Sequence, residues 1–141
     1  MPLEIKGEKS VPHSDDQAIL AAAEQLVAAF GRHDRQAYFS CFAPEATFVF
    51  YNQPVRFENR KEYEDEWRRW EVEDGFRVLS CHSSEQHVQR FGDLAIFTHS
   101  VYTVIATTKS EEALRERETI VFRAGKPGTW IAVHEHLSPV P

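Results

Sequence analysis

The chain has 141 residues, 42% of them hydrophobic and 27% charged, and its formal net charge is −6. This length and composition are typical of one folded domain and exclude a disordered chain. The acidic balance argues against nucleic acid as a partner, and the 2 cysteines are too few for a disulfide framework.

The first segment, residues 1–13, has prolines and a glycine but no periodic apolar pattern. It predicts a flexible arm ahead of a single domain over residues 14–141. The arm lacks the apolar stretch of a signal peptide. The longest apolar run, residues 18–23, is far shorter than the roughly 20 residues that cross a bilayer. We therefore expect a cytoplasmic protein without a membrane partner.

Capping signals mark two N-terminal helices. Ser14 opens the first, because Gln17 three residues later completes a capping box, and Gly31 is a natural C-terminal stop. Asp34 is a suitable N-cap for a second, shorter helix that Pro44 ends. Apolar residues recur at helical spacing in both segments, which predicts that both helices pack against a core.

A strand and a third helix follow. Residues 46–51, ATFVFY, are rich in β-branched and aromatic side chains, which favours a strand. Asn59 with Glu62 repeats the capping-box signal and begins a helix that Gly75 ends. Trp67 lies on the apolar stripe of this helix and is expected at the rim of any cavity beneath it.

The rest of the sequence predicts four strands, over residues 76–90, 94–108, 114–123 and 129–137, joined by short turns. Sequential strands with short connections form an antiparallel meander rather than a parallel sheet. The element order is therefore α-α-β-α-β-β-β-β, and the fold class is α+β.

Four local signatures carry a resemblance to a known superfamily. They are HDRQAYFSCFAPEATF, FGDLAIFT, RETIVFR and the closing Trp-x-x-Val-His-x-His-x-Ser. Together they resemble the nuclear-transport-factor-2-like (NTF2-like) superfamily. The ending is similar to that of its SnoaL-like group and of the calcium/calmodulin-dependent kinase association domain. The resemblance implies a cystatin-like cone, in which a curved antiparallel sheet wraps around three helices and leaves a pocket, and it implies a homodimer.

The last predicted strand carries His134 and His136 two residues apart. Alternation along a strand places Trp130, Ala132 and both imidazoles on one face. The resemblance implies that Trp130, His134 and His136 are structural and lie at a subunit interface, because members without a metal keep the same ending.

A metal-dependent enzyme is the less favoured alternative for the histidine pair. A His-x-His pair binds zinc or iron only when a further ligand joins it. Glu116, His82 and His87 are the available candidates, and no carboxylate follows the pair in the sequence. We therefore expect no metal site and no other cofactor.

The opposite face of the last strand is expected to line the pocket. We predict as lining residues Tyr38, Phe50, Trp67, Val101, Ile120, Glu135 and Leu137. By alignment to the kinase association domain, Val101, Ile120 and Leu137 stand where that family has cavity arginines. The resemblance therefore implies a small apolar or weakly polar ligand rather than a carboxylate.

Likeness to the ketosteroid isomerase branch identifies one acid. By alignment, the catalytic tyrosine of that branch falls on Leu26, its aspartate base on Phe50 and its protonated acid on Glu118. That route to isomerisation is therefore not expected, since nothing at position 50 can move a proton.

Glu118 and His99 remain the candidate catalytic residues. Both lie on predicted neighbouring strands, where they can form an acid–base pair. The structural alternative pairs Glu118 with Arg115 or Arg117 on a solvated strand and makes His99 a hydrogen-bonded core residue.

Two functions stay open. The first is a SnoaL-like protein that binds a small molecule in an apolar pocket, with or without acid–base catalysis of the isomerase or cyclase kind. The second is a non-catalytic, homo-oligomeric association module of the same fold. An open cavity would favour the first and a fully packed cone the second.

Overall fold

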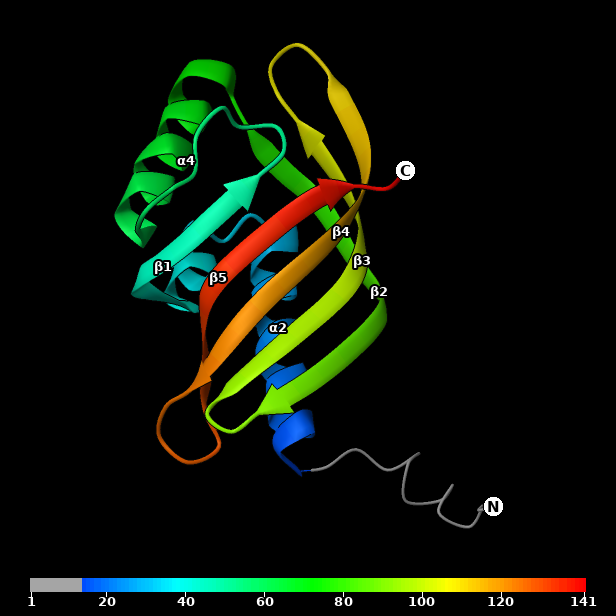
Figure 1. The fold of residues 1–141 in the computed structure, drawn as a ribbon. Helices are drawn as coiled ribbons and strands as arrows, with labels where there is room; N and C mark the ends of the chain where they lie inside the picture. The colour runs from blue at the N-terminus through cyan, green and yellow to red at the C-terminus, as the bar shows by residue number, and fades with distance from the viewer. Residues whose placement is uncertain (1–13) are drawn as a thin grey trace.

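The computed structural model describes residues 14–141, and the arm expected over residues 1–13 lies outside this range. The elements are α2 (Ser14–Gly31), α3 (Arg35–Ser40), β1 (Phe42–Phe50), α4 (Arg60–Asp74), β2 (Arg77–Phe91), β3 (Leu94–Ala106), β4 (Glu111–Ala124) and β5 (Trp130–Pro139). Their order confirms the predicted α+β arrangement (Figure 1). No helix in the described range is long and apolar enough to cross a membrane.

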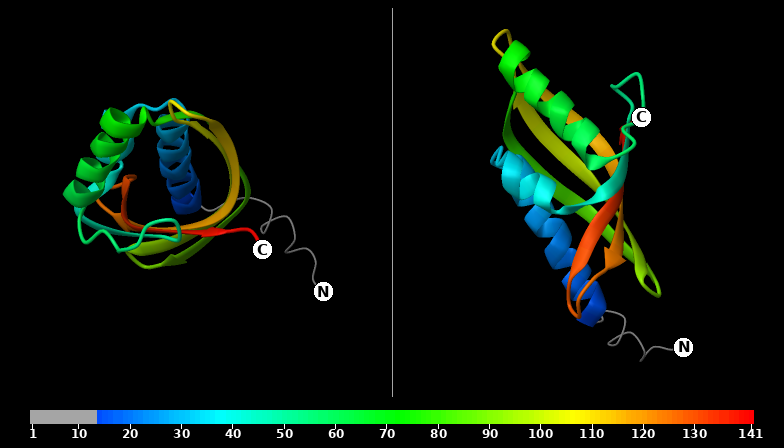
Figure 2. Two further views of the ribbon diagram at one scale, coloured as in Figure 1. Left: turned by 90° about the horizontal axis from the view of Figure 1, so that it is seen from above. Right: turned by 90° about the vertical axis from the view of Figure 1, so that its left-hand side faces the viewer.

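The five strands form one curved sheet in the order β1-β5-β4-β3-β2. The strands β2 to β5 make the expected antiparallel meander, while β1 pairs with β5 in parallel. Seen from above, the sheet curves into an incomplete ring with the helices on its inner side (Figure 2). The cone expected from the resemblance is therefore the fold of this chain.

Two of the predicted N-caps and one predicted C-terminal stop are formed by the expected residues. The Asp34 carboxylate accepts a hydrogen bond from the Ala37 amide at 3.1 Å, and the Asn59 side chain accepts one from the Glu62 amide at 2.9 Å. Gly75 ends α4 with a left-handed φ of 66°. A Cβ atom there would lie 2.5 Å from the Thr108 side chain, so glycine is required for both conformation and space.

A β-bulge in β5 changes which side chains face inward. Val121 of β4 pairs with His134, but the next residue, Phe122, pairs with Ala132, so one residue of β5 is extra. Ala132 is fully buried and Trp130 packs against the core cluster, whereas His136 is exposed. The expectation that Trp130 and Ala132 share the outward face with the imidazoles is therefore wrong, because simple alternation does not hold across the bulge.

Candidate functional site

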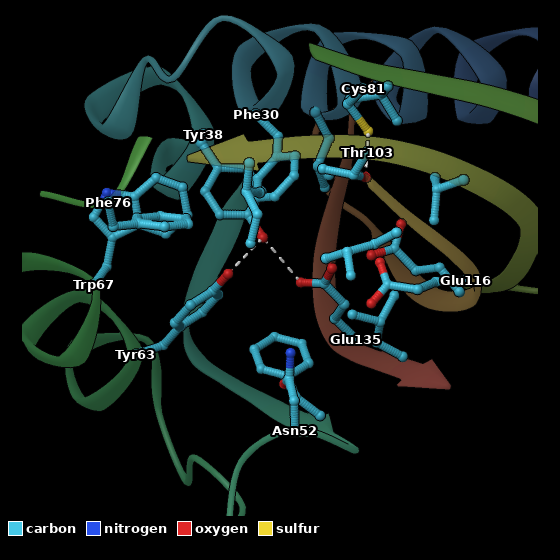
Figure 3. Close-up of a pocket in the computed structure, with 18 of the residues that line it drawn as sticks. Phe30, Tyr38, Asn52, Tyr63, Trp67, Phe76, Cys81, Thr103, Glu116 and Glu135 are labelled. Carbon is cyan, nitrogen blue, oxygen red and sulfur yellow. Dashed lines mark hydrogen bonds between the residues drawn. The ribbon is translucent and has the colours of Figure 1, made fainter. Parts of the chain in front are cut away.

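A cavity of about 110 Å³ lies between the helices and the concave face of the sheet (Figure 3). Its wall combines apolar and aromatic side chains from all three helices with polar side chains from the strands. The lining residues are Leu26, Val27, Phe30, Tyr38, Phe50, Asn52, Tyr63, Trp67, Trp70, Phe76, Cys81, Val101, Thr103, Ile105, Leu114, Glu116, Glu118, Glu135 and Leu137.

Most side chains predicted from the sequence to line a pocket do so. The wall includes Tyr38, Phe50, Trp67, Val101, Glu135 and Leu137, and it also includes Glu118. Ile120 is the exception, because it is fully buried in the hydrophobic core and does not reach the cavity. His99 is buried behind Glu118 rather than in the wall.

Three glutamates contribute carboxyl groups to the cavity. Glu116, Glu118 and Glu135 are only 3%, 8% and 4% exposed. Glu116 and Glu118 are two residues apart on β4 and so share a face of the sheet, and Glu135 lies opposite Ile120 on β5. No lysine, arginine or histidine belongs to the described lining, so the wall offers acidic but no basic side chains.

The side chains of Glu118 and Glu135 are neighbours in the cavity wall, because the two residues are diagonal to each other across the pairing of β4 with β5. Burial, together with the charge of Glu118, raises the pKa of Glu135 well above its ordinary value. Burial also raises the pKa of Glu118, to which the charge of Glu116 adds. Two buried neighbouring carboxyl groups resist ionising together, so the pair favours keeping one proton inside the cavity.

Two tyrosines from different helices support this acid pair. The Tyr38 hydroxyl donates to Glu135 Oε1 at 3.1 Å and lies 3.1 Å from the Tyr63 hydroxyl (Figure 3). Since Tyr38 uses its one hydrogen on Glu135, Tyr63 donates to Tyr38. Burial raises the pKa of both phenols, so they remain neutral donors.

The third glutamate, Glu116, has a separate partner in the segment that follows β1. The half-exposed Tyr51 hydroxyl donates to Glu116 Oε2 at 2.6 Å. Burial raises the pKa of Glu116, although the hydrogen bond from Tyr51 opposes this effect. Tyr51 directly follows β1, so the connection from β1 to α4 holds this carboxyl group in place.

His99 contacts the acid pair through Glu118. Its Nε2 atom lies 2.6 Å from Glu118 Oε1, and its Nδ1 atom lies 2.6 Å from Ser83 Oγ. Burial lowers the pKa of His99 to about 4, so the imidazole is neutral at physiological pH. The two residues selected from the sequence are therefore neighbours, and in the described range Glu118 pairs with His99 rather than with Arg115 or Arg117.

The histidine pair on β5 lies away from this cavity. His134 Nδ1 is hydrogen-bonded to Thr47 Oγ1 of β1 at 2.8 Å. The ring centroids of His134 and His136 are 6.3 Å apart. Within residues 14–141, no group of three or more histidine, cysteine or acidic side chains is arranged to hold a metal ion. His134 therefore serves to join β5 to its parallel neighbour.

Sequence reasoning missed Tyr63 and Glu116 as cavity residues. Tyr63 lies four residues before Trp67 on the apolar stripe of α4, so its spacing was visible, but its buried hydroxyl was not a recognisable signal. Glu116 and Glu118 are two residues apart on β4, so the sequence indicated that they share a face of the strand. It did not indicate that this face borders a cavity.

Comparison with known proteins places the chain in a family. The model of the SnoaL-like domain matches residues 19–141. A search of curated proteins gives no significant match.

Solved structures share the fold at low sequence identity. An NTF2-like protein of unknown function in nutrient uptake from Rhodospirillum rubrum ATCC 11170 aligns with a TM-score of 0.73 and 19% identity, covering 87% of this chain and 98% of the other. A protein like the calcium/calmodulin-dependent kinase II association domain, from Exiguobacterium sibiricum 255-15, aligns with a TM-score of 0.74 and 15% identity, covering 93% and 97%. A ketosteroid isomerase-like protein from Erwinia carotovora atroseptica SCRI1043 aligns with a TM-score of 0.72 and 18% identity, covering 89% and 95%. These likenesses establish the fold, and the domain match establishes that this chain belongs to the SnoaL-like family of NTF2-like proteins.

Proposed function

We propose that this protein binds a small apolar molecule in the cavity and transfers a proton to or from it through Glu118 and Glu135. The observation that carries the proposal is the pair of buried, neighbouring carboxyl groups in an otherwise largely apolar wall. One carboxyl group of such a pair holds a proton while its neighbour can accept one. The pair therefore supplies both an acid and a base at one place.

The size of the cavity supports a small ligand. A dry engineered cavity of about 150 Å³ is large enough to bind benzene. The cavity here, at about 110 Å³, is of similar scale and fits a ligand of about one ring. Aromatic rings from Tyr38, Tyr63 and Trp67 supply flat apolar contacts, while the carboxyl pair supplies hydrogen bonds to a carbonyl or hydroxyl group.

A proton-exchange assay tests this function without knowledge of the natural substrate. Cyclohexanone in deuterated water exchanges the hydrogens beside its carbonyl group, and NMR follows the exchange. We expect the protein to accelerate the exchange, and Glu118→Gln or Glu135→Gln to lower the acceleration by about 10²-fold or more, the usual share of a general acid or base. Equal exchange with either variant and the unchanged protein would contradict the proposal.

Binding is tested separately from chemistry. Val101 lines the cavity, so we expect Val101→Leu to fill space and weaken binding of cyclohexanone, measured by ligand-detected NMR. Val121→Leu is the matched control, because Val121 pairs with His134 and does not line the cavity. If Val101→Leu and Val121→Leu bind the probe equally, the cavity is not its site.

Assembly into a homodimer is a second, compatible proposal. It rests on three exposed side chains of the sheet, His136, Leu79 and Tyr102. Light scattering of the purified protein tests it, and a monomer at all accessible concentrations would exclude the homodimer and the association module together.

A further inference from the structure

A chain of hydrogen bonds leads from the cavity to the edge of the sheet. Glu118 lies in the cavity wall and contacts His99, and His99 contacts Ser83 on β2, the strand at the sheet edge. The Gln86 side chain donates to Ser83 Oγ at 2.9 Å. Four side chains from three neighbouring strands therefore form one continuous path.

From His99 toward the edge of the sheet, the side chains of the path become more exposed. The side chain of His99 is fully buried and that of Glu118 is 9% exposed. Ser83 is half-buried and Gln86 is exposed to solvent. One end of the path thus reaches the cavity, and the other reaches bulk water at a different place on the molecule.

A β-bulge creates the outer end of the path. The register of β2 against β3 shifts between Ser84 and His87, and Glu85 within it has a left-handed φ of 53°. The positive φ is uncommon for a residue with a side chain. The bulge brings Gln86 back over Ser83, where regular alternation would carry it away.

We infer that His99 is a proton relay that exchanges the proton of Glu118 with solvent through Ser83. The transfer starts from an ionised Glu118 and an imidazole protonated at Nε2. The Nε2 proton moves to Glu118 Oε1, the Ser83 hydroxyl proton moves to His99 Nδ1, and the serine oxygen takes a proton from a solvent acid or water. The products are a neutral glutamic acid, the other neutral imidazole tautomer and an intact serine.

The hydrogen bonds are satisfied both before and after the transfer. Before it, Ser83 donates to Nδ1 and His99 donates from Nε2 to the carboxylate. After it, Glu118 donates to Nε2 and His99 donates from Nδ1 to Ser83 Oγ. Gln86 donates to the serine oxygen in both states. The path therefore accepts either tautomer without moving a side chain.

The surroundings of His99 favour this tautomer exchange over a charged intermediate. Burial lowers the pKa of His99 to about 4, so a persistent imidazolium is disfavoured. Phe97 packs on the ring with centroids 4.6 Å apart. The titratable groups around the pair come from β2, β4, β5, α3 and α4, and are Cys81, Glu116, Glu118, Glu135, Tyr38 and Tyr63.

A relay at this place has a specific use. A ligand bound against Glu118 in the cavity would not displace His99, because His99 is not part of the cavity wall and contacts Glu118 from the neighbouring strand. The acid pair can then take up or release a proton while a ligand occupies the cavity. The relay is a property of the free protein, so its test needs no ligand and stays separate from the test of proton transfer to a substrate.

NMR of the imidazole nitrogens tests the relay. In ¹⁵N-histidine-labelled protein, the His99 signals are identified by their loss in His99→Gln. We expect the Nε2–H tautomer when Glu118 is ionised and the Nδ1–H tautomer when Glu118 is protonated, so the tautomer changes during a pH titration. A single tautomer throughout the ionisation of Glu118 would overturn the inference, and this result is read from the unchanged protein once His99→Gln has assigned the signals.

Exchange of the His99 ring hydrogen with water gives the second readout. We expect Ser83→Ala to slow this exchange by roughly tenfold, the effect of removing one buried hydrogen bond from the transfer path. Ser83→Thr keeps the hydroxyl and should restore the rate. Ser100→Ala is the matched control, because Ser100 bonds Glu85 and not His99. A purely structural serine predicts the opposite sign, since destabilisation speeds exchange by opening, so an unchanged or faster rate in Ser83→Ala would also overturn the inference.

Discussion

His99 Nε2 lies 2.6 Å from Glu118 Oε1, in a part of the core where the histidine side chain has no exposed surface. Neighbouring strands hold the two residues directly opposite each other, since His99 of β3 pairs with Glu118 of β4. The contact links a neutral imidazole to an acid pair that faces the cavity. This one contact should therefore affect both the stability of the folded protein and the proposed proton transfer.

The pH dependence of stability should change in His99→Gln. The folded pKa of His99, about 4, is below the ordinary value of 6.5, so its stabilising contribution is present above pH 6.5 and is lost as the pH falls toward 4. That loss amounts to roughly 3 kcal/mol at most. Urea unfolding from pH 7 to pH 4 should show a shallower decline for His99→Gln than for the unchanged protein.

The raised pKa values of the glutamates oppose this trend, so the comparison between variants is the informative quantity. Phe97→Leu is a suitable control, because it removes the aromatic ring that packs on His99 but leaves every titratable group in place. Identical pH slopes for His99→Gln and the unchanged protein would show that His99 does not carry this effect.

Removing the hydroxyl group of Tyr38 should destabilise the fold more than removing that of Tyr63. Tyr38→Phe deprives the buried carboxyl group of Glu135 of a donor and should cost about 1–3 kcal/mol. Tyr63→Phe removes only the bond to Tyr38 and should cost about 1 kcal/mol. Tyr38→Phe should also raise the pKa of Glu135 further, because the bond from Tyr38 lowers it. Chemical denaturation of both variants checks the order, and a larger loss for Tyr63→Phe would contradict it.

The charge of a ligand should decide whether it binds. Benzyl alcohol and benzoate have similar size, but benzoate places a carboxylate beside three glutamates with no basic side chain in the described wall. We expect benzoate to bind at least roughly tenfold more weakly than benzyl alcohol, a difference of about 1.4 kcal/mol. Calorimetric titration measures both constants. Tighter binding of benzoate would mean that the acidic wall is not the contact surface.

Zinc should not stabilise the fold through the two histidines on β5. His134 already bonds Thr47, and no further ligand joins the pair within the described residues. Thermal unfolding with zinc should therefore show no increase in Tm that depends on the pair. The double variant His134→Gln/His136→Gln is the control, and an increase confined to the unchanged protein would point to a metal site.

Local signals predicted much of the fold and part of the candidate site. The caps at Asp34, Asn59 and Gly75 depend on short-range hydrogen bonds and backbone conformation, so they could be inferred from neighbouring residues. The contact between His99 and Glu118 followed from strand order alone. These features require only one or two adjacent elements to be placed correctly.

The missed features depend on irregularities and on distant contacts. The bulge in β5 turned Trp130 and Ala132 inward, and a period of two residues contains no sign of it. The parallel pairing of β1 with β5 joins residues about ninety positions apart, as in Thr47 with His134. The bond from Tyr38 to Glu135 needs both the helix and the last strand in place, so sequence spacing did not indicate it.

Carbon-13 NMR of labelled glutamate carboxyl groups, followed as a function of pH, tests the central claim most directly. Glu118→Gln and Glu135→Gln assign the two signals. We predict that one carboxyl group of the pair titrates well above the ordinary value of 4.5 and that Glu118→Gln lowers the pKa of Glu135 toward it, because the charge of Glu118 is removed. If both carboxyl groups titrate near 4.5 in the unchanged protein, the cavity holds no shared proton and the proposed chemistry is wrong.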